Sequence, residues 1–162
     1  MLYVLRRHGP WLSAVVLGLC LIAGGLFFIV KAQATKADIT AELKLEQITT
    51  SADASIPGVL VQDAKTARAQ AEAIKGHTLG TWGPYTQLAR DDPRRAQYID
   101  GVALRSALNL AVASYGVADL ATGAGVVTLV AGLANVLLAA PGLNYIAGAG
   151  VKRPAAAGPP KK

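Results

Sequence analysis

Two long apolar runs divide the chain, and the stretch between them mixes polar and apolar positions. Residues 11–30 contain no charged side chain, and a helix of this length spans about 30 Å, the thickness of the hydrocarbon core of a bilayer. Residues 120–140 form a second uncharged run, which ends at Pro141 and Gly142, a pair that does not readily continue a helix. The pattern therefore predicts two transmembrane helices.

The first run has an alternative interpretation as a cleaved signal peptide. Arg6 and Arg7 form a basic segment before it, and residues 32–34 read Ala-Gln-Ala, an A-x-A cleavage pattern. The core of a signal peptide, however, is only about 7 to 15 residues long. We therefore expect a retained helix, with the lone Cys20 as a packed thiol inside it.

Residues 31–119 are predicted to form a small helical extracytoplasmic domain. Helical periodicity over residues 31–43 indicates that the first helix continues beyond the membrane. Residues 41–45 also alternate apolar and polar, so a short strand is the alternative there. Residues 49–58 have the composition of a loop.

Two further helices are predicted inside this domain from their start signals. Asp63 is placed to cap a helix over residues 64–75, which Gly76 would end. Asp92 and Pro93 form a second start signal, for a long helix that leads into the second membrane segment.

Several other residues of this domain have a predicted structural role. We expect Gly101 and Gly116 to be bend points of the long helix, and residues 79–93 to form an ordered loop anchored by the aromatic side chains of Trp82 and Tyr85.

Basic residues near the ends of the two runs predict the orientation in the membrane. Residues 31–105 are almost neutral, with ten basic and nine acidic side chains. Because cytoplasmic segments carry an excess of Lys and Arg, residues 1–10 and the disordered tail 141–162 should both be cytoplasmic, where the basic residues can contact anionic lipid. The six terminal basic residues are Arg6, Arg7, Lys152, Arg153, Lys161 and Lys162.

Composition narrows the class of function. Of the 162 residues 52% are hydrophobic and 16% are charged, against about 25% charged in a typical soluble domain. The net charge of +6 is not gathered into a basic patch with aromatic side chains, so nucleic-acid binding is not expected.

Nucleotide-binding, hydrolase and zinc-protease motifs do not occur in the sequence. His8 and His77 are predicted on opposite sides of the membrane. We therefore predict that the protein is not an enzyme and that it binds no metal or cofactor. His77 is expected to interact with the C-terminal end of the preceding helix.

Small residues at four-residue spacing are the candidate helix-packing positions. Helices in lipid associate where small side chains let their backbones approach closely. One such step lies in the first run and the others lie in the second. The candidates are Ala14 and Gly18, Ala121 and Gly125, and Ala124, Thr128 and Gly132.

Asp119 is the only charged residue between Arg105 and Lys152. A carboxylate at the centre of a bilayer is costly, so we expect Asp119 at the outer interface, facing water, a headgroup or a partner protein. A pair with Arg105 is disfavoured, because the two residues lie about 21 Å apart along an unbroken helix. The alternative is a proton or ion path lined by Asp119.

The strings TARAQAEAIKGHTL at residues 66–79 and PYTQLARDDPRR at residues 84–95, followed by a glycine-bearing apolar helix, carry a resemblance to a known family. Over residues 48–138 the chain resembles small two-helix membrane proteins of actinobacteria, whose members are often labelled aromatic ring-opening dioxygenases. That chemistry requires several metal ligands, and the outer segment holds one histidine, His77. The resemblance therefore implies a bacterial two-helix topology without that activity.

These expectations lead to two hypotheses about function. The first is a non-catalytic accessory subunit of a larger bacterial inner-membrane complex, similar in plan to the small subunits of actinobacterial respiratory assemblies. The second is a self-assembling homo-oligomer that forms a pore or an envelope sensor. Both hypotheses make membrane lipids and other membrane-protein chains the binding partners.

Overall fold

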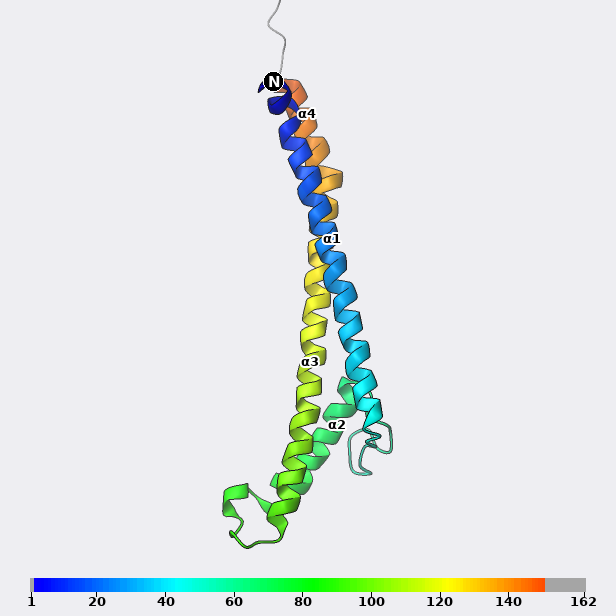
Figure 1. The fold of residues 1–162 in the computed structure, drawn as a ribbon, viewed down its shortest axis with the longest axis vertical. Helices are drawn as coiled ribbons and strands as arrows, with labels where there is room; N and C mark the ends of the chain where they lie inside the picture. The colour runs from blue at the N-terminus through cyan, green and yellow to red at the C-terminus, as the bar shows by residue number, and fades with distance from the viewer. Residues whose placement is uncertain (1, 151–162) are drawn as a thin grey trace, which may run out of the picture. The chain divides into compact units, whose positions relative to one another are not determined.

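The computed structural model describes the backbone of residues 2–150 and the side-chain surroundings of residues 8–149, and its architecture is all-α. Two long helices and a shorter one between them make up most of the fold (Figure 1). The elements are α1 (Leu2–Leu45), α2 (Ala64–Lys75), the π-helix η1 (Gly76–Gly80), the 3-10 turn η2 (Tyr85–Gln87), α3 (Arg94–Ala134), the π-helix η3 (Asn135–Ala139) and α4 (Ala140–Gly150).

Two helical stretches are long and apolar enough to cross a membrane. They are His8–Leu45 and Arg94–Ala149, and they include the runs predicted over 11–30 and 120–140. The prediction of two membrane-length helices with a shorter helix between them is therefore confirmed at this level.

The chain divides into two compact units. The first, here called the hairpin unit, consists of Met1–Ile29 and Gly123–Lys162. The second, here called the three-helix unit, consists of Val30–Thr122 and contains α2 together with the adjoining parts of α1 and α3.

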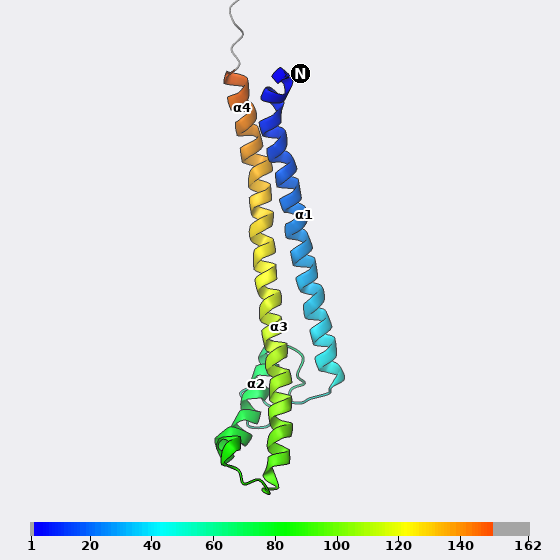
Figure 2. The same cartoon turned by 60° about the vertical axis from the view of Figure 1, so that its left-hand side comes forward.

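Within the hairpin unit, α1 lies alongside the end of α3 and alongside α4 in both views (Figures 1 and 2). The two sides of the hairpin run antiparallel, because Gly18 contacts Gly132 while Gly25 contacts Gly125. Apolar side chains on the outer faces stay uncovered; Phe27, for example, is 59% exposed and Val127 is 69% exposed.

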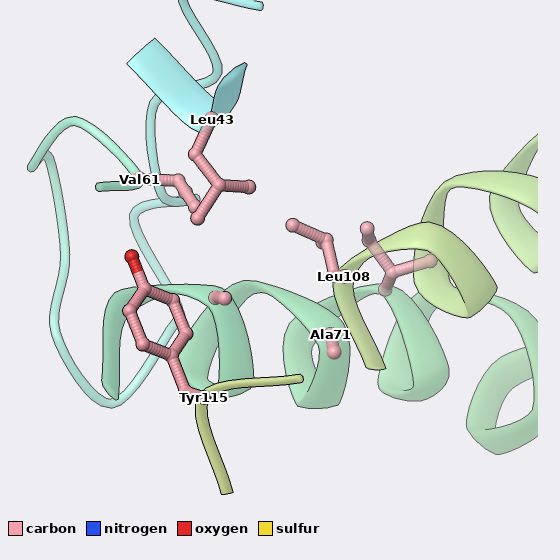
Figure 3. Close-up of a cluster of buried hydrophobic side chains, with 7 residues drawn as sticks. Leu43, Val61, Ala71, Leu108 and Tyr115 are labelled. Atoms are coloured by element: carbon pink, nitrogen blue, oxygen red, sulfur yellow. The ribbon is translucent and has the colours of Figure 1, made fainter. Parts of the chain in front are cut away.

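The three-helix unit has a hydrophobic core to which α1, α2, α3 and the loop before α2 all contribute. Val61 and Leu108 are its largest fully buried side chains, at 0% and 1% exposure. Figure 3 shows Leu43 and Val61 on one side of this cluster and Leu108 and Ala71 on the other. The remaining buried members are Ala67, Ile74 and Tyr115.

Helix α2 begins as the sequence predicts. Asp63 accepts a hydrogen bond from the backbone N–H of Thr66 at 2.8 Å, and the Thr66 hydroxyl accepts one from the backbone N–H of Asp63 at 3.2 Å. This reciprocal capping satisfies two backbone donors at the first turn. The predicted span of 64–75 is confirmed.

Gly76 follows the last residue of α2, as predicted, but the chain does not leave the helical conformation there. Its backbone is helical, with φ −58° and ψ −48°, and the chain continues into the wider turn of η1. The hydroxyl of Thr78 donates to the carbonyl of Ile74 at 2.8 Å, and that of Thr81 donates to the carbonyl of Gly76 at 3.0 Å. Two nearby hydroxyls therefore bond backbone carbonyls of this segment, which supports a helical continuation past the glycine.

The alternative of a strand over residues 41–45 is wrong, because α1 continues to Leu45. Leu43 lies on the helix face that enters the core, so burial selects the helical period over the alternating one. The helix ends where Gln47 adopts a left-handed conformation with φ 51°.

The helix end predicted at Pro141 is also wrong. The π-helix η3 precedes this proline, and α4 then continues through it, so residues 141–150 of the tail predicted to be disordered are helical. The rest of that predicted tail, 151–162, lies outside the described residues. In η3 the N–H of Ala140 bonds to the carbonyl of Asn135. A proline inside a regular helix would disrupt the bond to the carbonyl four residues earlier, and the wider turn accommodates that change locally.

Candidate helix-packing and partner-docking site

Two reciprocal glycine pairs, here called the glycine seam, join the sides of the hairpin unit. A Cβ atom on Gly25 would lie 2.6 Å from the carbonyl oxygen of Gly125, and one on Gly125 would lie 2.8 Å from that of Gly25. Gly18 and Gly132 meet in the same way, at 2.9 Å and 2.7 Å. Side chains of any size would collide with backbone here, so glycine is what allows this close approach.

The spacing within the seam is seven residues rather than the four that we predicted. Gly18, Gly125 and Gly132 lie in it, and Gly25 is a member that sequence reasoning missed. The signal that could have found Gly25 is the heptad step, from 18 to 25 on one side and from 125 to 132 on the other.

The other candidate packing residues lie beside the seam or away from it. Ala14 is buried, at 7% exposure. Ala121 is half-buried and Ala124 is exposed. Thr128 donates its hydroxyl to the carbonyl of Ala124 at 2.8 Å, a bond within its own helix.

A polar layer lies in the three-helix unit, where α1 faces α3. Lys36 donates a hydrogen bond to the carboxylate of Asp119. The Asp119 side chain is 69% exposed and that of Lys36 is 27% exposed. A solvated ion pair of this kind contributes only about 0 to 1 kcal/mol in water, so its main effect is to neutralise two charges next to an apolar helix.

Tyr115 connects three segments of the same layer. Its Oη lies 2.6 Å from the Thr40 hydroxyl and 3.2 Å from the backbone carbonyl oxygen of Gln62. Because a phenol has one proton, Tyr115 donates to the Gln62 carbonyl and accepts from Thr40. The layer therefore ties the loop before α2 to both long helices.

His77 lies at the far end of α2 and binds a loop residue instead of a helix terminus. Its Nε2 is 2.6 Å from Oδ2 of Asp53. Hydrogen bonding to His77 lowers the pKa of the Asp53 carboxyl below its usual range. The pair is exposed on both sides, and it fastens the loop over residues 46–63 to the end of the helix.

An aromatic cluster orders the loop before α3, and Tyr98 is its buried centre. The ring of Tyr98 lies 6.1 Å from that of Trp82 and 5.5 Å from that of Tyr85. Arg95 covers the Tyr85 ring at 4.2 Å and donates to its hydroxyl at 2.8 Å. Trp82 and Tyr85 were predicted as anchors, whereas Tyr98 was missed.

Asp92 caps α3, which begins one residue later than the start signal predicts. Oδ1 of Asp92 accepts from the backbone N–H of Arg94 at 2.9 Å, and the guanidinium of Arg94 binds both carboxylate oxygens. These bonds lower the pKa of Asp92 to about 2. The helix then continues through Gly101 and Gly116, and a Cβ on Gly101 would lie 2.7 Å from Cγ2 of Thr78, so this glycine admits the segment that follows α2.

An apolar hollow of about 400 Å³ lies beside the aromatic cluster. Its lining residues are Tyr85, Tyr98, Ile99, Val102 and Ala103. A second depression, of about 380 Å³, lies between the end of α2 and the start of α3, with His77 and Asp100 among its lining residues. Within the residues that the structure describes, three or more His, Cys, Asp or Glu side chains do not come together as a metal site.

No protein-family model matches the chain, and no curated protein or solved structure matches it at a significant level.

Proposed function

We propose that this chain is a non-catalytic accessory or structural subunit of a larger bacterial inner-membrane complex. The two long helices anchor it in the lipid, both termini are cytoplasmic, and residues 31–119 are extracytoplasmic. Respiratory assemblies are the first class of partner to test, because they contain small subunits of this plan.

The observation that supports membrane anchoring is the uncovered apolar surface of the hairpin unit. One face of each helix packs against the other helix at the glycine seam, while Phe27, Val127 and their neighbours remain exposed. In water this surface would be a strong association hazard. In a bilayer the same surface is solvated by lipid chains or by partner helices.

The ion pairs formed by the polar side chains support a structural role for residues 31–119. The Lys36–Asp119, His77–Asp53 and Arg94–Asp92 pairs each connect parts of the fold. Exposed apolar side chains also lie in the three-helix unit, among them Ile99, Leu110 and Val117. A surface of that kind fits protein contacts better than turnover of a polar substrate.

Orientation is tested by labelling single cysteines in a Cys20→Ser background with a membrane-impermeant maleimide. A cysteine replacing Ser51, in the loop before α2, should react in intact cells. A cysteine added after Lys162 should react only after the cells are lysed. The reverse pattern would refute the proposed orientation.

The accessory role is tested by affinity purification of the tagged full chain from its own membranes in mild detergent. Larger integral-membrane proteins should co-elute at a fixed ratio. Asp119→Asn should weaken that association if this carboxylate faces the partner, and Glu42→Gln, which removes an exposed carboxylate from α1, is the matched control. A ring of identical chains with no other protein would overturn the accessory role in favour of a pore or sensor.

A further inference from the structure

A second heptad stripe runs along the part of α3 that belongs to the three-helix unit. Its positions alternate three-residue and four-residue steps, and every one of them is exposed. Ile99, Leu110 and Val117 are 52%, 69% and 65% exposed, and Leu120 is 76% exposed. The stripe, here called the α3 stripe, consists of Ala96, Ile99, Ala103, Ser106, Leu110, Ala113, Val117 and Leu120.

The α3 stripe lies opposite the face that packs inside the three-helix unit. Gly101, Leu108 and Tyr115 meet α1, α2 and the loop before α2. In a heptad these three residues occupy the position farthest from the stripe. The stripe is therefore a separate apolar surface, which the core of the unit does not cover.

Contact with lipid does not explain the exposure of the α3 stripe, because α1 carries exposed charged side chains at the same level. Lys36 pairs with Asp119, Thr40 pairs with Tyr115, and Leu43 and Leu108 belong to the same core cluster. Residues 36–43 of α1 therefore lie beside residues 108–119 of α3. At this level the outer face of α1 carries the exposed carboxylates of Asp38 and Glu42. Placing these two carboxylates in the hydrocarbon core of a bilayer would be costly, so this part of the chain lies in water.

We propose that the α3 stripe is the interface with a second copy of this chain, in a parallel α3–α3 coiled coil outside the membrane. The inference rests on the proposed membrane anchoring, because two copies inserted with the same topology present their stripes in parallel and at the same depth. The symmetry of this contact is two-fold, so each layer pairs a residue with its own counterpart.

Charge complementarity favours a second copy as the occupant. The α3 stripe contains no charged residue, so self-pairing brings no like charges together. Arg95 and Asp100 flank its outer end at the two heptad positions that face each other across a parallel pair. The Arg95 guanidinium is held by neutral groups of its own chain, the Tyr85 hydroxyl and the Leu88 carbonyl, so it keeps its positive charge. That charge lies across the interface from Asp100 of the other copy, twice by symmetry, which favours the parallel orientation.

The shape of the surface also fits this occupant. Large side chains are interspersed with alanine and serine along the stripe, so the helices can approach closely at the small layers while leucine, isoleucine and valine fill the others. At the outer end, Ile99, Val102 and Ala103 line the apolar hollow. Ile99 of the second copy is placed to enter it.

Disulfide cross-linking of the purified full chain in lipid vesicles tests the interface. In a Cys20→Ser background, Leu110→Cys and Val117→Cys should form dimers under mild oxidation, with a yield that does not fall when the chain is diluted in lipid. Glu42→Cys, at the same level on α1, is the matched control and should remain monomeric. Equal yields at all three positions would overturn the proposal.

Dissociation measurements give an independent readout. Leu110 enters the interface from both copies, so Leu110→Lys should raise the dissociation constant of the dimer at least about 100-fold. Leu45→Lys, which changes an exposed leucine off the stripe, should leave it within about 3-fold. Helical content by circular dichroism shows whether each variant remains folded.

The remaining outcomes separate this inference from the proposed function. Cross-linking of Leu110→Cys to a different protein in native membranes, with no dimer in vesicles, would overturn the second copy as occupant while supporting an accessory subunit. A dimer in vesicles from a chain that purifies without larger partners would support the interface and contradict the accessory role.

Discussion

Alanine substitution at two adjacent glycines of α1 separates helix propensity from packing in the glycine seam. A Cβ on Gly25 would lie 2.6 Å from the Gly125 carbonyl oxygen and 2.7 Å from the backbone N of Leu129. A Cβ on the neighbouring Gly24 would meet nothing within 4 Å. Both changes raise the intrinsic preference for helix by up to about 1 kcal/mol, so the difference between the two variants isolates the cost of the collision.

The structure sets the scale of that difference. To bring the new Cβ at Gly25 to even 3.0 Å from the oxygen, the two sides of the hairpin must separate by at least about 0.4 Å. A gap of 0.5–1 Å along a packed face already loses about a quarter to a half of each contact energy. Overpacking of this kind costs about 1 to 3 kcal/mol. We therefore expect Gly25→Ala to be less stable than Gly24→Ala by that amount.

The assay is reversible opening of the hairpin unit in mixtures of a mild detergent and SDS. Dyes on Leu17→Cys and Leu133→Cys, two exposed positions on opposite sides of the hairpin, report opening as a loss of energy transfer in a Cys20→Ser background. A difference below about 0.5 kcal/mol between the two alanine variants would refute the close backbone approach at Gly25.

Three further predictions concern the three-helix unit. Asp63→Ala should lower its stability by about 0.5 to 2 kcal/mol through loss of the cap. Hydrogen bonding to Thr66 lowers the pKa of Asp63, so the capping contribution should be present above the usual pKa of an aspartate and be lost as the pH falls through the lowered value, as thermal melts between pH 2 and pH 6 can show. Tyr115→Phe should cost about 0.5 to 1.5 kcal/mol in the same melts, because the Gln62 carbonyl loses its donor; an unchanged melting temperature would contradict that bond. Gly83→Ala should destabilise the aromatic loop by about 1 to 2 kcal/mol, since φ is +73° at this position, and unaltered near-ultraviolet circular dichroism and stability would count against the described turn.

Elements with local signals could be predicted from the sequence. The cap at Asp63 and the helix after it depend on residues within one turn of each other, and so does the start of α3 near Asp92. The two membrane-length helices follow from uninterrupted apolar runs. In these cases the physical cause and the sequence signal lie in the same short segment.

Local breakers are poor guides where the surrounding structure accommodates them. α2 ends before Gly76 as predicted, but the chain stays helical beyond it, where the hydroxyls of Thr78 and Thr81 bond backbone carbonyls. The helix end predicted at Pro141 is wrong, because the π-turn before it accommodates the missing N–H. Glycine and proline weaken a helix by only about 1 and 3 kcal/mol, amounts that the surrounding structure can offset.

Long-range pairing accounts for most of what the sequence left open at the candidate site. Asp119 was expected to face water, a headgroup or another protein, and its partner Lys36 is 83 residues away in the chain. The Tyr115 network likewise joins residues that no short motif connects. Gly25 was missed for a different reason: a four-residue template was applied to a seam whose period is seven.

The reciprocal glycine pairs also limit the alignments in which the two sides of the hairpin unit can assemble. Sliding one side by a full heptad in one direction would keep a single glycine pair, Gly18 with Gly125, and would set Gly132 against Trp11. Sliding by fewer residues would bring side chains against backbone at both levels. The native alignment is thus the one in which both pairs close, so the glycine pairs of the hairpin unit specify its register.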